Sequence, residues 1–133
     1  MKTNELRIGN YVKRTLPTDM AYAKVLEITH NGLLVQDKDG YVGCSMNFIE
    51  PIELTEEVLV KIGFVKENEI NRMYNNRCVV SYYIGNFYKE LVIEVRRENG
   101  FYKNNMVHYD IKYLHELQNA YYCLTGQELE VEL

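Results

Sequence analysis

The sequence predicts an α+β protein in which a strand-rich first part precedes a capped helix, an antiparallel sheet and a longer helix. Three observations carry this prediction. They are short β-rich runs with turn signals up to residue 50, a sharply delimited helix at 55–63, and an amphipathic helix after a tyrosine-rich region. Of the 133 residues, 47% are hydrophobic and 26% are charged, which is typical of an ordinary folded protein.

Residues 1–52 are expected to form an SH3-like small β-barrel. Short runs that favour strands alternate there with turn residues, and Asn31-Gly32 is the strongest hairpin signal among them. Several short strands in a segment of this length fold most simply into a curled sheet or barrel. The runs span 8–13, 21–29, 33–36 and 41–48.

A short helix is predicted directly after this first part. Thr55 is a favoured N-cap, and the two glutamates that follow it suit the positive end of the helix dipole. Leu54 and Leu59 occupy the two positions of a hydrophobic staple. Gly63 supplies the residue that ends a helix in the left-handed conformation.

Residues 53–133 are predicted to continue as an antiparallel meander, a helix at about 112–125 and a final edge strand, packed with 1–52 as one unit. Leucines and a tyrosine share one face of this helix. Beyond Gly126, leucine and valine alternate with glutamate, which predicts a strand whose charges deter edge pairing. The expected meander strands are 69–74, 77–84, 87–96, 101–103 and 106–111, and the helix face consists of Leu114, Leu117, Tyr121 and Leu124.

Composition and motifs argue against several classes of function. The net charge of −4 resides in 110–133, which disfavours binding of nucleic acid phosphates there. No glycine-rich phosphate loop, G-x-S-x-G elbow or H-E-x-x-H motif occurs, so no cofactor is implied. No apolar run is long enough for a membrane helix and no signal core opens the chain, so we expect a cytoplasmic protein.

The histidines and cysteines are the candidates for chemistry. His108 and Asp110 lie two residues apart on a predicted strand and share a face, where with Glu94 they would form an acid–base site. The alternative is a solvated strand face that ends in a helix N-cap at Asp110. His108, His115 and Cys123 match no metal-ligand spacing, so no metal is expected, and Cys123 is expected in the core.

Twelve tyrosines, against four phenylalanines and no tryptophan, are the compositional oddity of the chain. Strands favour tyrosine for packing alone, but tyrosine also offers a large rigid contact area with a polar tip. The sequence therefore predicts a binding surface on the meander, and it leaves open which tyrosines are exposed. Its candidate residues are Tyr74, Tyr82, Tyr83, Tyr88, Tyr102, Arg96 and Arg97.

Three stretches of the chain carry a resemblance. They are NELRIGNYV at 4–12, PIELTEEVLVKIGF at 51–64 and IKYLHELQNAYYCLTGQEL at 111–129. Together they resemble a group of short uncharacterised proteins from Bacteroidetes genomes, many of them in prophages or other mobile elements. The resemblance implies a bacterial or phage setting in the cytoplasm, and it transfers no catalytic residue.

These observations leave three hypotheses about function. The favoured one is a non-enzymatic binding protein of phage or mobile-element origin, with a protein partner and a role as inhibitor of a host defence factor. The second is a single-stranded nucleic-acid-binding accessory protein, in which tyrosines stack on bases and Arg96 and Arg97 contact phosphates. The third is a small enzyme that uses His108 and Asp110. The sequence also leaves open whether the chain forms a homodimer.

Overall fold

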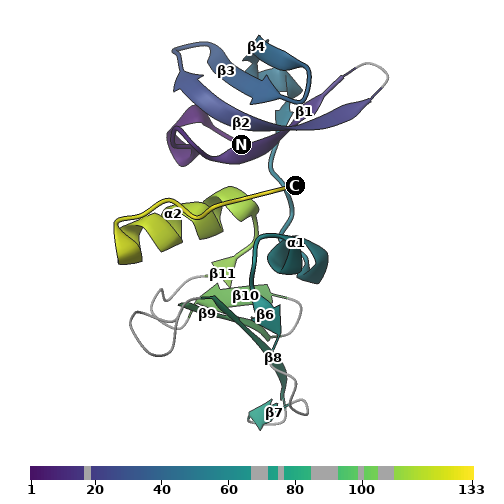
Figure 1. Ribbon diagram of the computed structural model, residues 1–133, viewed down its shortest axis with the longest axis vertical. Helices are drawn as coiled ribbons and strands as arrows, with labels where there is room; N and C mark the ends of the chain where they lie inside the picture. Colours follow the sequence, from purple (N-terminus) through teal and green to yellow (C-terminus); the bar gives the residue numbers. More distant parts are fainter. Residues whose placement is uncertain (17–18, 67–71, 75–76, 85–92, 99–100, 105–109) are drawn as a thin grey trace.

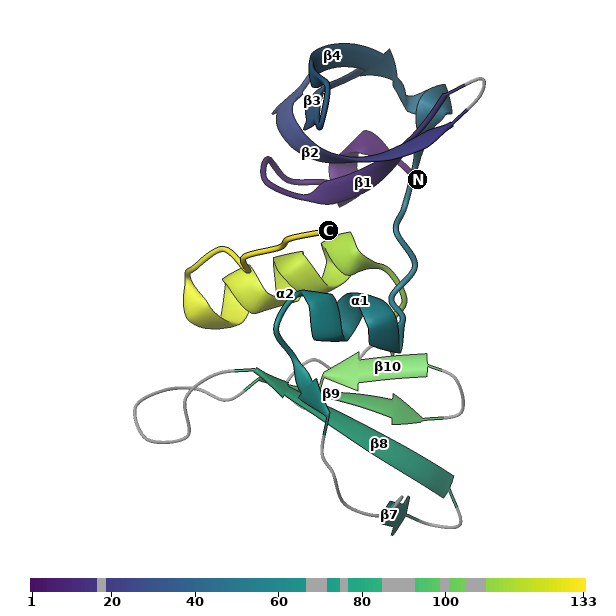
Figure 2. The same ribbon diagram turned by 45° about the vertical axis from the view of Figure 1, so that its right-hand side comes forward.

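The computed structural model describes residues 1–16, 19–66, 72–74, 77–84, 93–98, 101–104 and 110–133, and from 66 to 110 it describes the backbone alone. Its elements form three layers, with both α-helices between two antiparallel β-sheets (Figures 1 and 2). The α+β class is therefore confirmed.

The N-terminal sheet and its flanking turns comprise η1 (Thr3–Glu5), β1 (Tyr11–Thr15), β2 (Met20–Ile28), β3 (Gly32–Asp37), β4 (Gly40–Ser45), η2 (Met46–Phe48) and β5 (Ile49–Glu50). The helices are α1 (Glu56–Lys61) and α2 (Leu114–Thr125). The C-terminal sheet comprises β6 (Val65–Lys66), β7 (Arg72–Tyr74), β8 (Arg77–Ile84), β9 (Ile93–Glu98), β10 (Phe101–Asn104) and β11 (Asp110–Ile111).

The N-terminal sheet has the strand order β4-β3-β2-β1-β5. The predicted Asn-Gly hairpin is confirmed, because the Thr29 amide donates to the Gly32 carbonyl at 2.9 Å and links β2 to β3. β4 and β5 are the two edges of an open sheet, so a closed SH3-like barrel is not confirmed. The inner face holds its own core, made of Leu6, Val12, Ala23, Val25, Leu33, Val35 and Ile49.

The predicted caps of α1 are confirmed. The Thr55 hydroxyl accepts from the Val58 amide at 3.2 Å, which satisfies a free donor of the first turn. At the other end Gly63 has a φ of 100°, and the Phe64 amide donates to the Leu59 carbonyl at 3.0 Å. This is the bond pattern of a Schellman motif, and it turns Phe64 back into the core.

The C-terminal sheet is an antiparallel meander, as predicted. Its strands run in the order β11-β10-β9-β8-β6, and β7 also pairs with β8. The strand predicted at 77–84 coincides with β8. The strand predicted at 87–96 is found as β9, with 87–92 outside the described residues, and 106–109 are likewise outside them next to β11.

The helix layer holds a second core, to which both helices contribute. Leu114 and Leu117 of the predicted α2 face are fully buried, and Tyr121 and Leu124 pack against them. α1 adds Val58 and Leu59, while the residues that flank the two helices add Ile52, Leu54, Ile62, Phe64 and Ile111.

The predicted final strand is wrong. Residues 127–133, the C-terminal segment, form no strand and run between the N-terminal sheet and α2 (Figures 1 and 2). Leu129 and Val131 are buried in the helix-layer core, while the glutamates that alternate with them, Glu128, Glu130 and Glu132, are exposed. The alternation of apolar residues and glutamates therefore indicates an extended segment with one buried side. Among the described residues, this segment does not pair with the edge of a sheet.

We predict that Thr55→Ala destabilises the protein by about 1 kcal/mol, because the Val58 amide loses its acceptor. Urea unfolding followed by circular dichroism measures this loss. Thr55→Ser keeps the hydroxyl and is the matched control, so it should unfold near the wild-type midpoint. Equal losses in the two variants would contradict the capping role.

Candidate binding groove

α2 carries a second buried face, which is polar and turned toward the N-terminal sheet. His115 and Gln118 of this face are each 1% exposed, and Asn10, at the entry to β1, is 0% exposed. Buried polar groups are tolerated when they are hydrogen-bonded. The partners of these side chains therefore decide how the two halves of the chain are joined.

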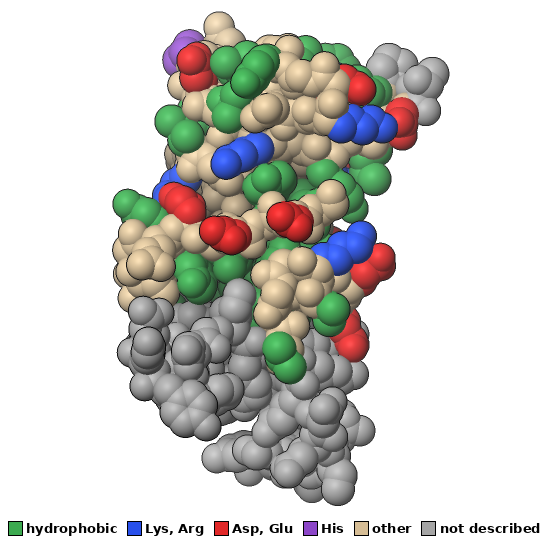
Figure 3. Space-filling view, viewed as in Figure 1, with side chains coloured by type: hydrophobic (Ala, Val, Ile, Leu, Met, Phe, Trp, Pro, Cys, Tyr) green, Lys and Arg blue, Asp and Glu red, His purple; other side chains and the backbone are tan. Residues whose placement is uncertain are grey.

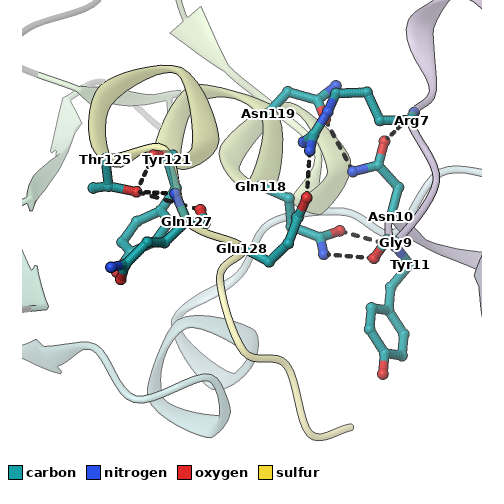
Figure 4. A network of polar contacts seen from close by, with 10 residues as sticks. All are labelled: Arg7, Gly9, Asn10, Tyr11, Gln118, Asn119, Tyr121, Thr125, Gln127 and Glu128. Atoms are coloured by element: carbon teal, nitrogen blue, oxygen red, sulfur yellow. Dashed lines mark hydrogen bonds and ion pairs between the residues drawn. The ribbon is translucent and has the colours of Figure 1, made fainter.

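Gln118 binds the backbone of the β1 entry with both ends of its amide. Its Oε1 accepts from the Tyr11 amide at 2.9 Å, and its Nε2 donates to the Gly9 carbonyl at 3.1 Å (Figure 4). A neighbouring strand would bond the same two groups, and β5 reaches β1 only at Lys13 and Arg14. No strand in the described part of the chain bonds these two groups, and Gln118 takes the place of one.

Asn10 and Asn119 extend this junction. Asn10 Nδ2 donates to Asn119 Oδ1 at 2.9 Å, and Asn10 Oδ1 accepts from the Arg7 amide at 2.7 Å. The Arg7 guanidinium bonds Asn119, forms an ion pair with Glu128, and lies 4.0 Å from the ring centroid of Tyr122. Arg7 therefore holds the start of the C-terminal segment against both α2 and the N-terminal sheet (Figure 4).

The groove follows the C-terminal segment on the outer face of β1 and β2. One hollow of about 550 Å³ is bounded by Met20 and Tyr22 on the sheet side and by Leu133 on the segment side. A second hollow of about 500 Å³ continues toward Ile8 and Gly9. The two hollows share four lining residues, so we treat them as one waist groove; these are Tyr11, Lys24, Val131 and Glu132.

The waist groove combines apolar area with charges of both signs. Met20 and Tyr22 are 48% and 40% exposed at one end. Burial, and to a smaller degree the Glu132 carboxylate, raise the pKa of Tyr11, so its hydroxyl stays protonated near neutral pH. Acidic side chains cross the middle of this face with basic ones above them (Figure 3). The groove-lining charges are Lys24, Lys38, Asp37, Glu128, Glu130 and Glu132.

Most of the residues predicted for function fall outside what the structure describes. Tyr88 and His108 lie outside the described residues, as do the side chains of Tyr74, Tyr82, Tyr83, Arg96, Arg97, Tyr102 and Asp110. The backbone register sets Tyr102 opposite Arg97, and Lys103 opposite both Arg96 and Asp110. Both the tyrosine surface and the His108–Asp110 pair therefore stay predictions.

Cys123 is exposed on α2, so its predicted place in the core is wrong. His115 of the same helix is buried, so His115 and Cys123 lie in different environments. Within the described ranges, no group of three or more His, Cys, Asp or Glu side chains is arranged to hold a metal ion.

The sequence interpretation missed the waist groove and the junction. A signal for the groove was present, since Met20, Tyr22 and Lys24 alternate with the buried Ala21, Ala23 and Val25 in β2. No comparable signal predicted the role of Gln118, because the residues that it bonds lie 107 and 109 positions away in the sequence.

Searches among protein-family models, curated proteins and solved structures yield no match to this chain. None of the helices in the described part of the chain is long and apolar enough to cross a membrane.

We predict that Gln118→Leu lowers the free energy of unfolding by at least about 2 kcal/mol. The leucine fills the volume but leaves the Tyr11 amide and the Gly9 carbonyl without a partner. Urea unfolding measures the effect, and Gln127→Leu, at an exposed position of the C-terminal segment, is the control. A Gln118→Leu variant as stable as the control would show that the amide is dispensable.

His115 predicts a dependence of stability on pH. Its ring stacks on Tyr113, its Nδ1 has no hydrogen-bond partner among the described residues, and burial lowers its pKa although Glu116 and Glu5 oppose the shift. The unfolded chain takes up the proton near pH ~6.5. The stabilising contribution is therefore complete above that pH and is lost as the pH falls from there toward the lower folded pKa.

As the pH falls from about 7.5 to about 5.5, the free energy of unfolding of wild type should decrease more steeply than that of His115→Phe, by up to about 1.4 kcal/mol per pH unit. The phenylalanine keeps a ring but cannot titrate. Urea unfolding over this range provides the measurement. His30→Phe, in the exposed turn after β2, should keep the wild-type slope. Parallel slopes for wild type and His115→Phe would refute the assignment.

Proposed function

We propose that this chain is a non-enzymatic binding protein that takes a protein partner in the waist groove. The observation that carries the proposal is the groove itself, which has exposed Met20 and Tyr22 on one wall and exposed Leu133 at the end of the other. Methionine and tyrosine are enriched where proteins contact proteins. Methionine also adapts its shape to varied apolar surfaces.

The contacts that hold the walls in place support the same proposal. β1 is held by Gln118, and the start of the C-terminal segment is held by Arg7 through Glu128. Leu129 and Val131 anchor the rest of the segment in the helix-layer core. A groove with preformed walls loses little conformational entropy when a partner binds.

The charges of the groove favour protein over nucleic acid. Lys24 and Lys38 lie on the sheet side, but Glu128, Glu130 and Glu132 line the opposite side. Those carboxylates would repel a phosphate backbone, whereas a polypeptide supplies apolar, basic and acidic groups together. Nucleic acid binding through the meander is the alternative that the experiment must separate.

The biological setting follows from the resemblance to Bacteroidetes and prophage-associated proteins. A protein of phage or mobile-element origin acts in the cytoplasm of its host, and binding a host protein is the simplest activity for a chain with such a groove. Inhibition of a host defence factor is the role that we propose for this binding.

The test is affinity capture from a lysate of a Bacteroidetes host, with and without nuclease and over a salt series. We predict that wild type retains a stoichiometric protein after nuclease treatment. The double variant Met20→Ser, Tyr22→Ser should bind it more than about tenfold more weakly. Phe48→Ser removes an aromatic group that is 53% exposed outside the groove, and it should bind normally.

Two outcomes would contradict the proposal. Full retention of the partner by the double variant would place the contact elsewhere on the chain. Loss of all bound material on nuclease treatment, with affinity falling steeply as salt rises, would favour the nucleic-acid alternative.

A further inference from the structure

β4 is an edge strand without the usual protection. It ends the order of the N-terminal sheet, and the register of its pairing with β3 is regular throughout. Its sequence, GYVGCS, contains no charged residue and no proline. Natural proteins commonly protect such edges with charges, prolines or bulges, because a bare regular edge accepts another strand.

The backbone groups available for such pairing follow from the β3–β4 hairpin. Asp37 and Gly40 form the pair next to the two-residue turn, so Val42 and Cys44 bond inward to β3. The alternate residues of β4 direct their amide and carbonyl groups to the open side. These residues are Tyr41, Gly43 and Ser45.

Neither the contacts nor the backbone conformation within one copy of the chain require a glycine at position 43. An added Cβ would meet none of the described residues within 4 Å, and the φ of Gly43 is not among the positive glycine values. Gly32 differs, because a Cβ there would lie 2.2 Å from the Cys44 carbonyl oxygen. A glycine inside a strand costs stability and often marks the approach of another backbone or ligand.

The same face of β4 carries a projection and a hollow. Tyr41 is 71% exposed, and an open hollow of about 350 Å³ includes Gly43, Ser45 and the neighbouring Leu34 among its lining residues. An aromatic side chain from an adjacent strand is a known way to cover a glycine at a sheet edge. Tyr41 projects from β4, and the hollow begins two residues further on, at Gly43. When a second β4 runs antiparallel to the first, the Tyr41 side chain of each copy can therefore enter the hollow of the other.

We propose that β4 is a homodimer interface, in which two copies pair antiparallel about a two-fold axis at Gly43. Gly43 then faces Gly43 of the second copy, and Tyr41 faces Ser45 of the second copy. In this register each Tyr41 ring covers the glycine of the other chain, and the open amide and carbonyl groups bond in pairs. The edge carries no charge, so nothing repels the second copy, and the interface is independent of the waist groove.

The test uses charges that meet only if the two-fold axis is correct. Gly43→Lys and Gly43→Glu each place like charges opposite one another, and each should weaken dimerisation by roughly a hundredfold. Mixing the two variants pairs lysine with glutamate and should restore a dimer. Sedimentation equilibrium up to roughly 1 mM distinguishes the 15.7 kDa chain from its dimer.

Folding and the role of Tyr41 are checked in parallel. Both Gly43 variants should keep the wild-type urea midpoint measured at low concentration, because the added side chains enter open space. Tyr41→Ala should weaken the dimer by roughly tenfold or more.

Three results would overturn the proposal. They are a monomeric wild type over the whole range, a dimer that persists in Gly43→Lys, and a mixture of the two charged variants that stays monomeric. If wild type stays monomeric and β4 instead binds a strand of a different protein, the homodimer proposal is overturned in the same way.

Discussion

The amide of Gln118 is the contact on which the arrangement of the molecule depends. It bonds the Tyr11 amide and the Gly9 carbonyl, and so fixes α2 against the open edge of β1. The N-terminal sheet and the helix layer have separate hydrophobic cores. Hydrophobic burial alone leaves the rotation of one body against the other poorly defined, whereas two directional bonds to a strand edge define it.

The waist groove is a consequence of this junction. Tyr11, whose amide Gln118 bonds, packs against the helix-layer core and lines both hollows of the groove. Arg7 reaches from the same turn to Glu128 and fixes where the opposite wall begins. A change at Gln118, which does not line the groove, is therefore transmitted to the groove by Tyr11, and this couples stability to binding.

Local signals predicted much of the fold because their causes are local. Thr55 and Gly63 delimit α1 through bonds to residues three to five positions away, and the β8 strand matched its prediction end to end. The C-terminal segment was misassigned because alternation reports burial, which a strand and an extended segment share. Strand pairing needs a neighbouring backbone, and the sequence of the segment does not specify one.

The candidate site was harder to predict, since its decisive contacts join positions more than 100 residues apart. His115 and Gln118 have the polarity of a solvent face but are buried. The stretches 4–12, 51–64 and 111–129 build the junction and much of the helix layer.

Hydrogen exchange at the Tyr11 backbone amide, measured by NMR, tests the central claim most directly. This amide is bonded by Gln118, and no strand among the described residues bonds it. If the junction is rigid, the amide exchanges only when the whole protein unfolds, and its protection approaches the global free energy of unfolding. Exchange as fast as that of the exposed Lys38 amide in the β3–β4 turn would show that the junction opens freely and would contradict the account.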